Sequence, residues 1–171
     1  LKRPRTLVRN VVLDQMSTDS KRQSNNTKQY MKLKFSVESI QANKDSFLSL
    51  KVLQDSITRF ESRRLAPGGH EFEFESKKQT HIDFLISNKD PKHTVLHGHK
   101  NIKDTLVRVK SIFVNDQDVT SKINLFSNYF TPQYGTVKTN GWMTYNGTYS
   151  FKFRYPASNH ILYCTHYKPK N

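Results

Sequence analysis

The stretch Tyr30-Met31-Lys32-Leu33-Lys34-Phe35-Ser36-Val37-Glu38-Ser39-Ile40 decides the fold class, because apolar and polar side chains alternate along it. A strand places every second residue on one face, and those positions hold Met31, Leu33, Phe35 and Val37. Residues 71–75 and 80–86 alternate in the same way, and two more strands are expected over 93–99 and 106–114. We therefore expect six to eight strands in a mostly antiparallel sheet.

Two other segments have helical spacing. In residues 47–63, apolar side chains recur every three or four positions, at Phe47, Leu50, Leu53, Ile57 and Phe60. In residues 119–130 the same spacing relates Val119, Ile123, Phe126 and Phe130, and Thr131-Pro132 follows. The prediction is an α+β fold in one globular domain, 30–171, with two helices packed against the sheet.

Residues 142–155 predict a hairpin, because Asn146-Gly147 is a pair that favours a type I′ turn. Trp142 would then oppose Phe151. One face would carry Trp142, Tyr149, Phe151, Phe153 and Tyr155, and the other Met143, Tyr145, Lys152 and Arg154. The aromatic face is either a buried core or a base-stacking platform formed by Trp142, Tyr149 and Phe151. A last strand is expected over 160–167.

The surplus positive charge lies at the two ends of the chain. The net charge is +14, from 28 Lys and Arg against 14 Asp and Glu. Residues 1–34 hold nine basic and two acidic side chains, and residues 119–171 hold six basic side chains and no carboxylate. The polar, basic residues 1–29 are interpreted as a flexible arm. This distribution indicates a polyanionic partner, either nucleic acid or an anionic membrane surface.

The expected polyanion-binding residues fall into three groups along the chain. They are Lys2, Arg3, Arg5 and Arg9 in the arm; Arg59, Arg63 and Arg64; and Lys152, Arg154, Lys168 and Lys170. The second group would lie at the end of the first predicted helix. There it would bind a ligand or interact favourably with the helix dipole.

Three histidines, His93, His97 and His99, suggest a minor alternative. His97-Gly98-His99 on a strand would place two imidazoles on one face, as in metal-dependent nicking endonucleases of the rolling-circle type. Tyr134 or Tyr163 would then be the nucleophile. Gly98 stands where those enzymes carry a bulky apolar residue, and Tyr163 falls in a predicted strand. No catalytic residue and no cofactor is predicted.

Other features bear on the compartment. Cys164 is the only cysteine, which excludes a disulfide within the chain and is typical of a reducing environment. No apolar run reaches the length of a membrane-spanning helix, and the N-terminal residues do not have the pattern of a signal peptide. The expectation is an intracellular protein, associated with the virion if it is viral.

The order of elements from Tyr30 to Phe74 resembles the start of the core of rhabdovirus matrix proteins. The shared features are a basic arm, the alternating strand 31–37, the helical pattern of 47–63, and the break at Pro67-Gly68-Gly69. The Pro-Pro-x-Tyr motif of many animal-virus members is absent. The resemblance implies a non-enzymatic structural protein that self-associates and attaches a nucleocapsid to a membrane. The alternatives are a small viral capsid subunit and a single-strand nucleic-acid-binding protein.

Overall fold

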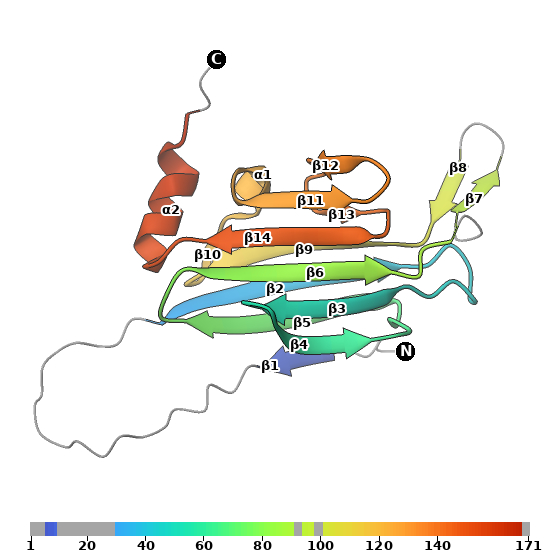
Figure 1. Cartoon of the computed structure of the whole chain (residues 1–171), viewed down its shortest axis with the longest axis horizontal. Helices are drawn as coiled ribbons and strands as arrows, with labels where there is room; N and C mark the ends of the chain where they lie inside the picture. Colours follow the sequence, from blue (N-terminus) through green and yellow to red (C-terminus); the bar gives the residue numbers. More distant parts are fainter. Residues whose placement is uncertain (1–5, 10–29, 91–93, 98–100, 169–171) are drawn as a thin grey trace, which may run out of the picture.

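The computed structural model describes residues 6–9, 30–90, 94–97 and 101–168, and it forms two β-sheets that face each other (Figure 1). Sheet A has the order β1 (Thr6–Arg9), β5 (Gly68–Ser76), β2 (Met31–Ile40), β9 (Leu106–Val114) and β10 (Gln117–Asp118), and β13 (Trp142–Met143) also pairs with β9. Sheet B has the order β12 (Gly135–Val137), β11 (Ser127–Thr131), β14 (Gly147–Phe153), β6 (Thr80–Ser87), β3 (Ser49–Gln54) and β4 (Ile57–Ser62).

The alternating pattern of 30–40 is confirmed as the central strand of sheet A. β2 pairs antiparallel with β5 and β9, and its inward side chains are buried. Phe35 lies at the middle of the core. Its ring centroid is 5.2 Å from those of Phe84 and Phe151, which belong to sheet B, and 5.9 Å from that of Phe74 on β5. Aromatic side chains from both sheets therefore fill the space between them.

The predicted helix over 47–63 is wrong, because these residues form the antiparallel pair β3 and β4. Asp55 and Ser56 connect the strands with φ angles of 47° and 69°, the two positive values that a type I′ turn requires. The Asp55 carboxylate stabilises this turn by accepting hydrogen bonds from Thr80 Oγ1 at 2.8 Å and from the His81 amide at 2.9 Å.

The second predicted helix is correct only at its start. Residues 120–126 form the short helices η2 (Thr120–Lys122) and α1 (Ile123–Phe126), and β11 begins at Ser127. Val119, Ile123 and Phe126 are buried, as helical spacing requires. Phe130 lies in β11 and is 53% exposed, because the strand turns it away from the core.

The predicted hairpin over 142–155 is also wrong. β13 pairs with β9 in sheet A, whereas β14 pairs with β6 and β11 in sheet B, so the chain changes sheets at 144–146. The predicted strand over 160–167 is instead the helix α2 (Ala157–His166). Tyr149, Phe151 and Phe153 are buried, as the core interpretation expects, whereas Trp142, predicted on the same face, lies in the other sheet and is 39% exposed.

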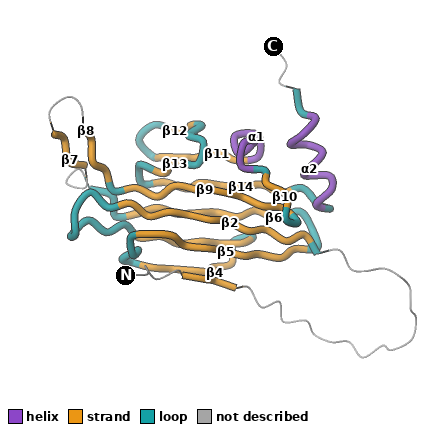
Figure 2. Tube along the Cα trace, turned by 180° about the vertical axis from the view of Figure 1, so that it is seen from behind, coloured by secondary structure: helices purple, strands orange, loops and turns teal. Residues whose placement is uncertain are grey.

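The α+β prediction is therefore overturned by a β-sandwich. Within the described residues the helices are η2, α1 and α2, and they lie at the edges of the sandwich and do not cover a sheet (Figures 1 and 2). A separate small hairpin, β7 (Thr94–His97) and β8 (Asn101–Asp104), extends from one end. Of the predicted arm, Thr6–Arg9 forms β1, which pairs in parallel with β5.

The two ends of the sandwich differ. The connections from β2 to β3, β6 to β7, β11 to β12 and β13 to β14 lie at one end, which we call the loop end (Figure 1). α2 projects from the opposite end, which we call the helix end. No helix in the described part of the chain has the length and apolarity needed to cross a membrane.

A candidate ligand pocket at the loop end

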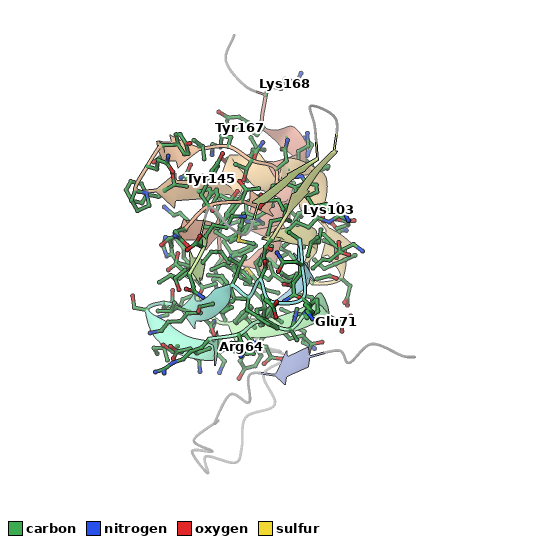
Figure 3. All side chains as sticks on the ribbon, turned by 90° about the vertical axis from the view of Figure 1, so that its right-hand side faces the viewer. Arg64, Glu71, Lys103, Tyr145, Tyr167 and Lys168 are labelled. Carbon is green, nitrogen blue, oxygen red and sulfur yellow. The ribbon has the colours of Figure 1, made fainter. Side chains whose placement is uncertain are left out.

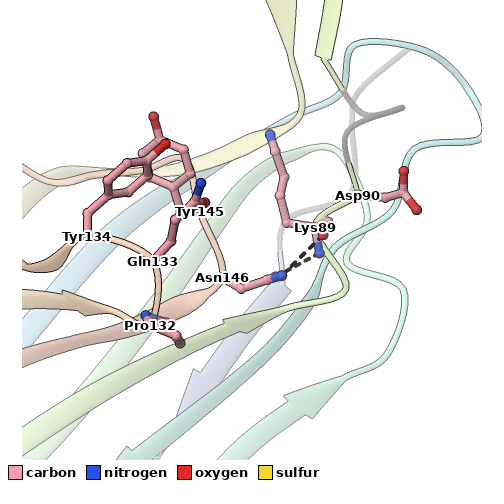
Figure 4. A pocket seen from close by; sticks show the side chains of 7 residues that line it. All are labelled: Lys89, Asp90, Pro132, Gln133, Tyr134, Tyr145 and Asn146. Carbon is pink, nitrogen blue, oxygen red and sulfur yellow. Dashed lines mark hydrogen bonds between the residues drawn. The ribbon is translucent and has the colours of Figure 1, made fainter.

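A pocket of about 410 Å³ lies at the loop end of the sandwich (Figure 4). Its walls come from three segments that are distant in sequence: the residues after β6, the β11–β12 turn and the segment before β14. They contribute Lys89, Asp90, Pro132, Gln133, Tyr134, Tyr145 and Asn146. This volume lies in the range of small-molecule sites in proteins.

Two tyrosine rings dominate the pocket. Tyr134 and Tyr145 are 54% and 41% exposed, although large aromatic side chains are usually buried. Their ring centroids are 4.9 Å apart and the rings are tilted by 60°, so each ring supports the other (Figure 4). Together they offer an apolar surface to solvent beside the Gln133 side chain, whereas Asp90 lies on the opposite side of the pocket, beyond Lys89 (Figure 4).

The backbone that carries the two rings is fixed from inside the core. The Tyr129 hydroxyl accepts a hydrogen bond from the Tyr145 amide at 3.0 Å and donates one to the Tyr145 carbonyl. Burial raises the pKa of Tyr129 to about 12, so the hydroxyl keeps its proton and can serve as donor. The Tyr134 amide donates to Thr131 Oγ1 at 3.0 Å. These bonds fix the backbone positions of both rings before a ligand arrives.

Asn146 and Lys89 join two of the walls. The Asn146 side chain accepts from the Lys89 amide at 2.7 Å and donates to the Lys89 carbonyl at 3.1 Å (Figure 4). The Lys89 ammonium donates to the Asp104 carboxylate and to the Thr105 carbonyl. The charge of Lys89 is thus paired with a carboxylate, and the other lining residues that the structure describes include no Lys or Arg.

The structure does not bring the three predicted groups of polyanion-binding residues together, although Arg154 and Lys168 lie at the same end of the sandwich. Arg63 and Arg64 follow β4, and the Arg64 guanidinium lies 4.2 Å from the centroid of the Phe47 ring. Figure 3 looks onto the loop end and shows Arg64 well apart from both Tyr145 and Lys168. Lys152 and Arg154 are exposed at the other end of sheet B, and Arg59 lies on the edge strand β4. Arg9 lies in β1, and Lys2, Arg3, Arg5 and Lys170 are outside the described residues.

The structure bears differently on the residues considered for base stacking and on the histidines considered as metal ligands. Tyr149 and Phe151 are buried, so they present no ring to a base, whereas Trp142 is 39% exposed with the Arg108 guanidinium 5.0 Å from its ring centroid. His93 and His99 lie outside the described residues, and only the backbone of His97, in β7, is described. Among the described side chains, no three His, Cys, Asp or Glu are grouped as a metal site requires.

Sequence reasoning considered Tyr134 only as a nucleophile and placed Tyr145 on the polar face of a hairpin. The signal for Tyr134 is present in Thr131-Pro132-Gln133-Tyr134-Gly135, where turn residues surround an aromatic one. The contribution of Lys89 and Asp90 could not be found in this way. They enter the pocket only because β6 and β14 are neighbours in sheet B.

Comparison with known proteins gives only a distant structural likeness. No family model and no curated protein matches the chain. Among solved structures, the carbohydrate-binding module vCBM60 in complex with galactobiose is similar with a TM-score of 0.45 and 15% identity, over 70% of this chain and 96% of that one. A selenomethionine form of vCBM60, described with two families of calcium-dependent carbohydrate-binding modules, gives a TM-score of 0.42 and 16% identity over 70% and 89%. At these values neither likeness assigns a ligand to this chain.

Proposed function

We propose that this chain is a non-enzymatic binding domain that takes an uncharged carbohydrate ring in the loop-end pocket. The observation that carries the proposal is the exposed pair Tyr134 and Tyr145, held on a fixed backbone beside Gln133. A pyranose ring has an apolar face of C–H groups and a rim of hydroxyls. An aromatic surface bordered by a side-chain amide is complementary to both.

The charge of the pocket favours a neutral ligand over a polyanion. Among the described lining residues Lys89 is the one cation, and its ammonium bonds to Asp104 and Thr105 and not to the pocket. A phosphodiester backbone needs Lys or Arg that can approach its oxygens, and these described residues offer no other cation. Matrix-type attachment, capsid assembly and single-strand nucleic-acid binding remain predictions from the charge of the sequence.

The proposal is tested by screening the chain on a microarray of neutral and sulfated oligosaccharides, followed by titration calorimetry with the strongest neutral one. Tyr134→Ala and Tyr145→Ala should each weaken binding by about tenfold or more, because each removes a stacking face. Tyr134→Phe should retain most of the affinity. Tyr167→Ala, which removes an exposed tyrosine at the helix end, is the matched control and should bind like the unsubstituted chain.

A different pattern would overturn the proposal. Binding restricted to sulfated oligosaccharides or RNA, lost in high salt and unchanged by Tyr134→Ala, would locate recognition on the basic residues and not in the pocket. Equal loss of binding in Tyr134→Ala and Tyr167→Ala would show that the substitutions destabilise the folded chain and do not remove a contact with the ligand.

A further inference from the structure

The helix end carries a group of cations with no carboxylate partner in the described part of the chain. Lys138 Nζ donates to the Asn124 carbonyl at 2.8 Å and to the Ser127 carbonyl at 2.6 Å, both uncharged acceptors. Lys122 lies beside Tyr167 in the wall of a hollow of about 210 Å³. Residues 119–168 contain no Asp or Glu, and the nearest carboxylate along the chain, Asp118, accepts hydrogen bonds from Thr120.

Aromatic contacts connect these cations to α2. The Arg154 guanidinium lies 4.0 Å from the centroid of the Tyr163 ring, and the Tyr163 and Tyr167 centroids are 5.4 Å apart. The Tyr163 hydroxyl donates to the Leu125 carbonyl at 3.1 Å, which ties α2 to the segment that carries Lys122. Lys122, Lys138, Arg154 and Lys168 are therefore among the exposed cations at this end.

α2 adds exposed apolar side chains to the same end. Its buried side consists of Ala157, His160 and Cys164, whereas Leu162 is 54% exposed and Tyr167, directly after the helix, is 45% exposed. The helix packs on the sandwich through His160, 5.0 Å from the Phe153 ring of β14, and projects beyond the ends of the strands in the two opposite views (Figures 1 and 2). Its outer side can thus reach a flat surface before the body of the sandwich does.

We propose that the helix end docks on the surface of a lipid bilayer that contains anionic phospholipids. Lys122, Lys138, Arg154 and Lys168 have no carboxylate partner among the described residues, which suits a negatively charged surface, and tyrosine side chains favour the membrane–water interface. Leu162 decides between a bilayer and a nucleic acid. An exposed leucine gains free energy when it enters the boundary between headgroups and acyl chains, and it gains nothing beside a hydrated phosphodiester backbone.

The test is flotation of the full chain with phosphatidylcholine vesicles, with and without phosphatidylserine, at low and high salt. The chain should float with the vesicles that contain phosphatidylserine, and it should separate from them at high salt. Lys122→Ser should reduce the bound fraction at limiting lipid by about fivefold, which corresponds to one surface cation. Leu162→Ser should reduce it by a similar factor.

Matched controls come from the loop end. Lys103→Ser makes the same change of net charge, and Phe130→Ser removes an apolar side chain that is equally exposed, at 53%. Both should float like the unsubstituted chain. Tyr134→Ala should float normally while it loses oligosaccharide binding, so a failure of this proposal is distinguishable from a failure of the pocket.

Three results would overturn the bilayer proposal. The first is equal flotation with vesicles of phosphatidylcholine alone. The second is flotation that disappears when Lys2, Arg3 and Arg5 are replaced by serine but persists in Lys122→Ser and Leu162→Ser. The third is binding to single-stranded RNA that is weakened by Lys122→Ser and unchanged by Leu162→Ser, which would assign the helix end to nucleic acid.

Discussion

The neighbours of Gly147 leave no room for a side chain at this position. It begins β14 beside β11, and a Cβ atom built on it would lie 2.2 Å from the Phe130 carbonyl oxygen and 3.1 Å from Tyr129 Cε2. The sequence Asn146-Gly147 indicated a turn glycine. The residue is instead required because two strands approach closely at the wall of the pocket.

Gly147→Ala should therefore lower the free energy of unfolding by about 2 kcal/mol or more, because backbone must move to admit the methyl group. Gly69→Ala is the matched control. Its Cβ would meet nothing within 4 Å, and we expect a change within about 0.5 kcal/mol or a slight gain. Urea unfolding of both variants measures the difference. Equal values for the two would contradict the close contact.

Lys89 offers a second test at the level of the residue. Its side chain is 11% exposed and that of its partner Asp104 is 20% exposed, so Lys89→Met leaves a carboxylate in a site that is largely closed to water. The expected loss is about 3 kcal/mol of unfolding free energy.

The control for Lys89 is Lys34→Met, which removes an ion pair 3.7 Å long between side chains that are 50% and 85% exposed. That pair should contribute less than about 1 kcal/mol. Urea unfolding at neutral pH compares the two variants. A loss in Lys34→Met as large as that in Lys89→Met would show that burial does not determine the cost.

At the scale of the element, α2 is held to the sandwich by an uncharged histidine. His160 lies between Phe126 and Phe153, with ring centroids 4.7 and 5.0 Å away, and its Nδ1 accepts a hydrogen bond from the Arg154 amide at 3.2 Å. Burial, and to a smaller extent the charge of Arg154, lowers the pKa of His160 to about 4. The imidazole is therefore neutral in the folded chain near neutral pH.

This histidine should make stability depend on pH. The unfolded chain binds a proton at His160 near pH 6.5 and the folded chain only near pH 4, so stability is complete above 6.5 and falls as the pH decreases toward 4. The difference between these two pKa values corresponds to a loss of about 3 kcal/mol in the free energy of unfolding. His160→Gln keeps an acceptor for the Arg154 amide and does not titrate. Urea unfolding from pH 7 to pH 4 should show a correspondingly smaller loss in this variant, and equal losses would contradict the prediction.

The thiol of Cys164 reports on the same helix. It is 2% exposed, and burial raises its pKa to about 11, although Lys122 and Arg154 lower it. The folded chain should therefore react with Ellman's reagent at least about a hundredfold more slowly than the chain in denaturant. Fast labelling under native conditions would mean that α2 leaves the sandwich without general unfolding.

The sequence predicted strands better than it predicted their connections. Alternation correctly placed β2, β5 and β6, because each buries one face of a regular pleat, and the strand expected over 106–114 is β9, whose pairing with β2 is interrupted by a bulge. Helical spacing gave the wrong prediction for 47–63, where Asp55-Ser56 makes the turn between two strands. Leu50 and Val52 are buried in the core, whereas Leu53 and Ile57 are not. A second turn of this kind, Asn115-Asp116 with φ angles of 46° and 65°, also lacks glycine. Both turns depend on polar residues that tolerate positive φ.

At the scale of the whole molecule, the two proposed surfaces lie at opposite ends of the sandwich. Among the described residues that line the loop-end pocket the one cation, Lys89, is paired, whereas Lys122, Lys138, Arg154 and Lys168 at the helix end have no carboxylate partner within the described residues. Screening by salt should therefore affect the two activities differently. Raising the salt concentration from 50 to 500 mM should abolish vesicle flotation and leave oligosaccharide affinity within about twofold. A parallel loss of both would contradict the separation.

The candidate pocket could be predicted only in part. Tyr134 and Tyr145 stand beside turn residues in the sequence, but their contact at 4.9 Å depends on β13 and β14 belonging to different sheets. Lys89 and Asn146 are 57 positions apart and meet through sheet pairing. No local sequence pattern can indicate a contact between residues that are so far apart along the chain. The charge surplus of residues 119–171 was visible in the composition, yet its position around α2 was not, since 160–167 was predicted as a strand.

The position of Asn146 in the pocket wall makes the choice of expression host important. Asn146-Gly147-Thr148 matches the acceptor pattern for N-linked glycosylation, and both polar atoms of the Asn146 amide are bonded to the Lys89 backbone in the pocket wall. Attachment of a glycan in a eukaryotic secretory host would place the added sugar in the pocket and disturb this bond pair. Material made in bacteria, or with Thr148→Val, would keep the amide unmodified. The expression host would then determine whether the binding surface is open.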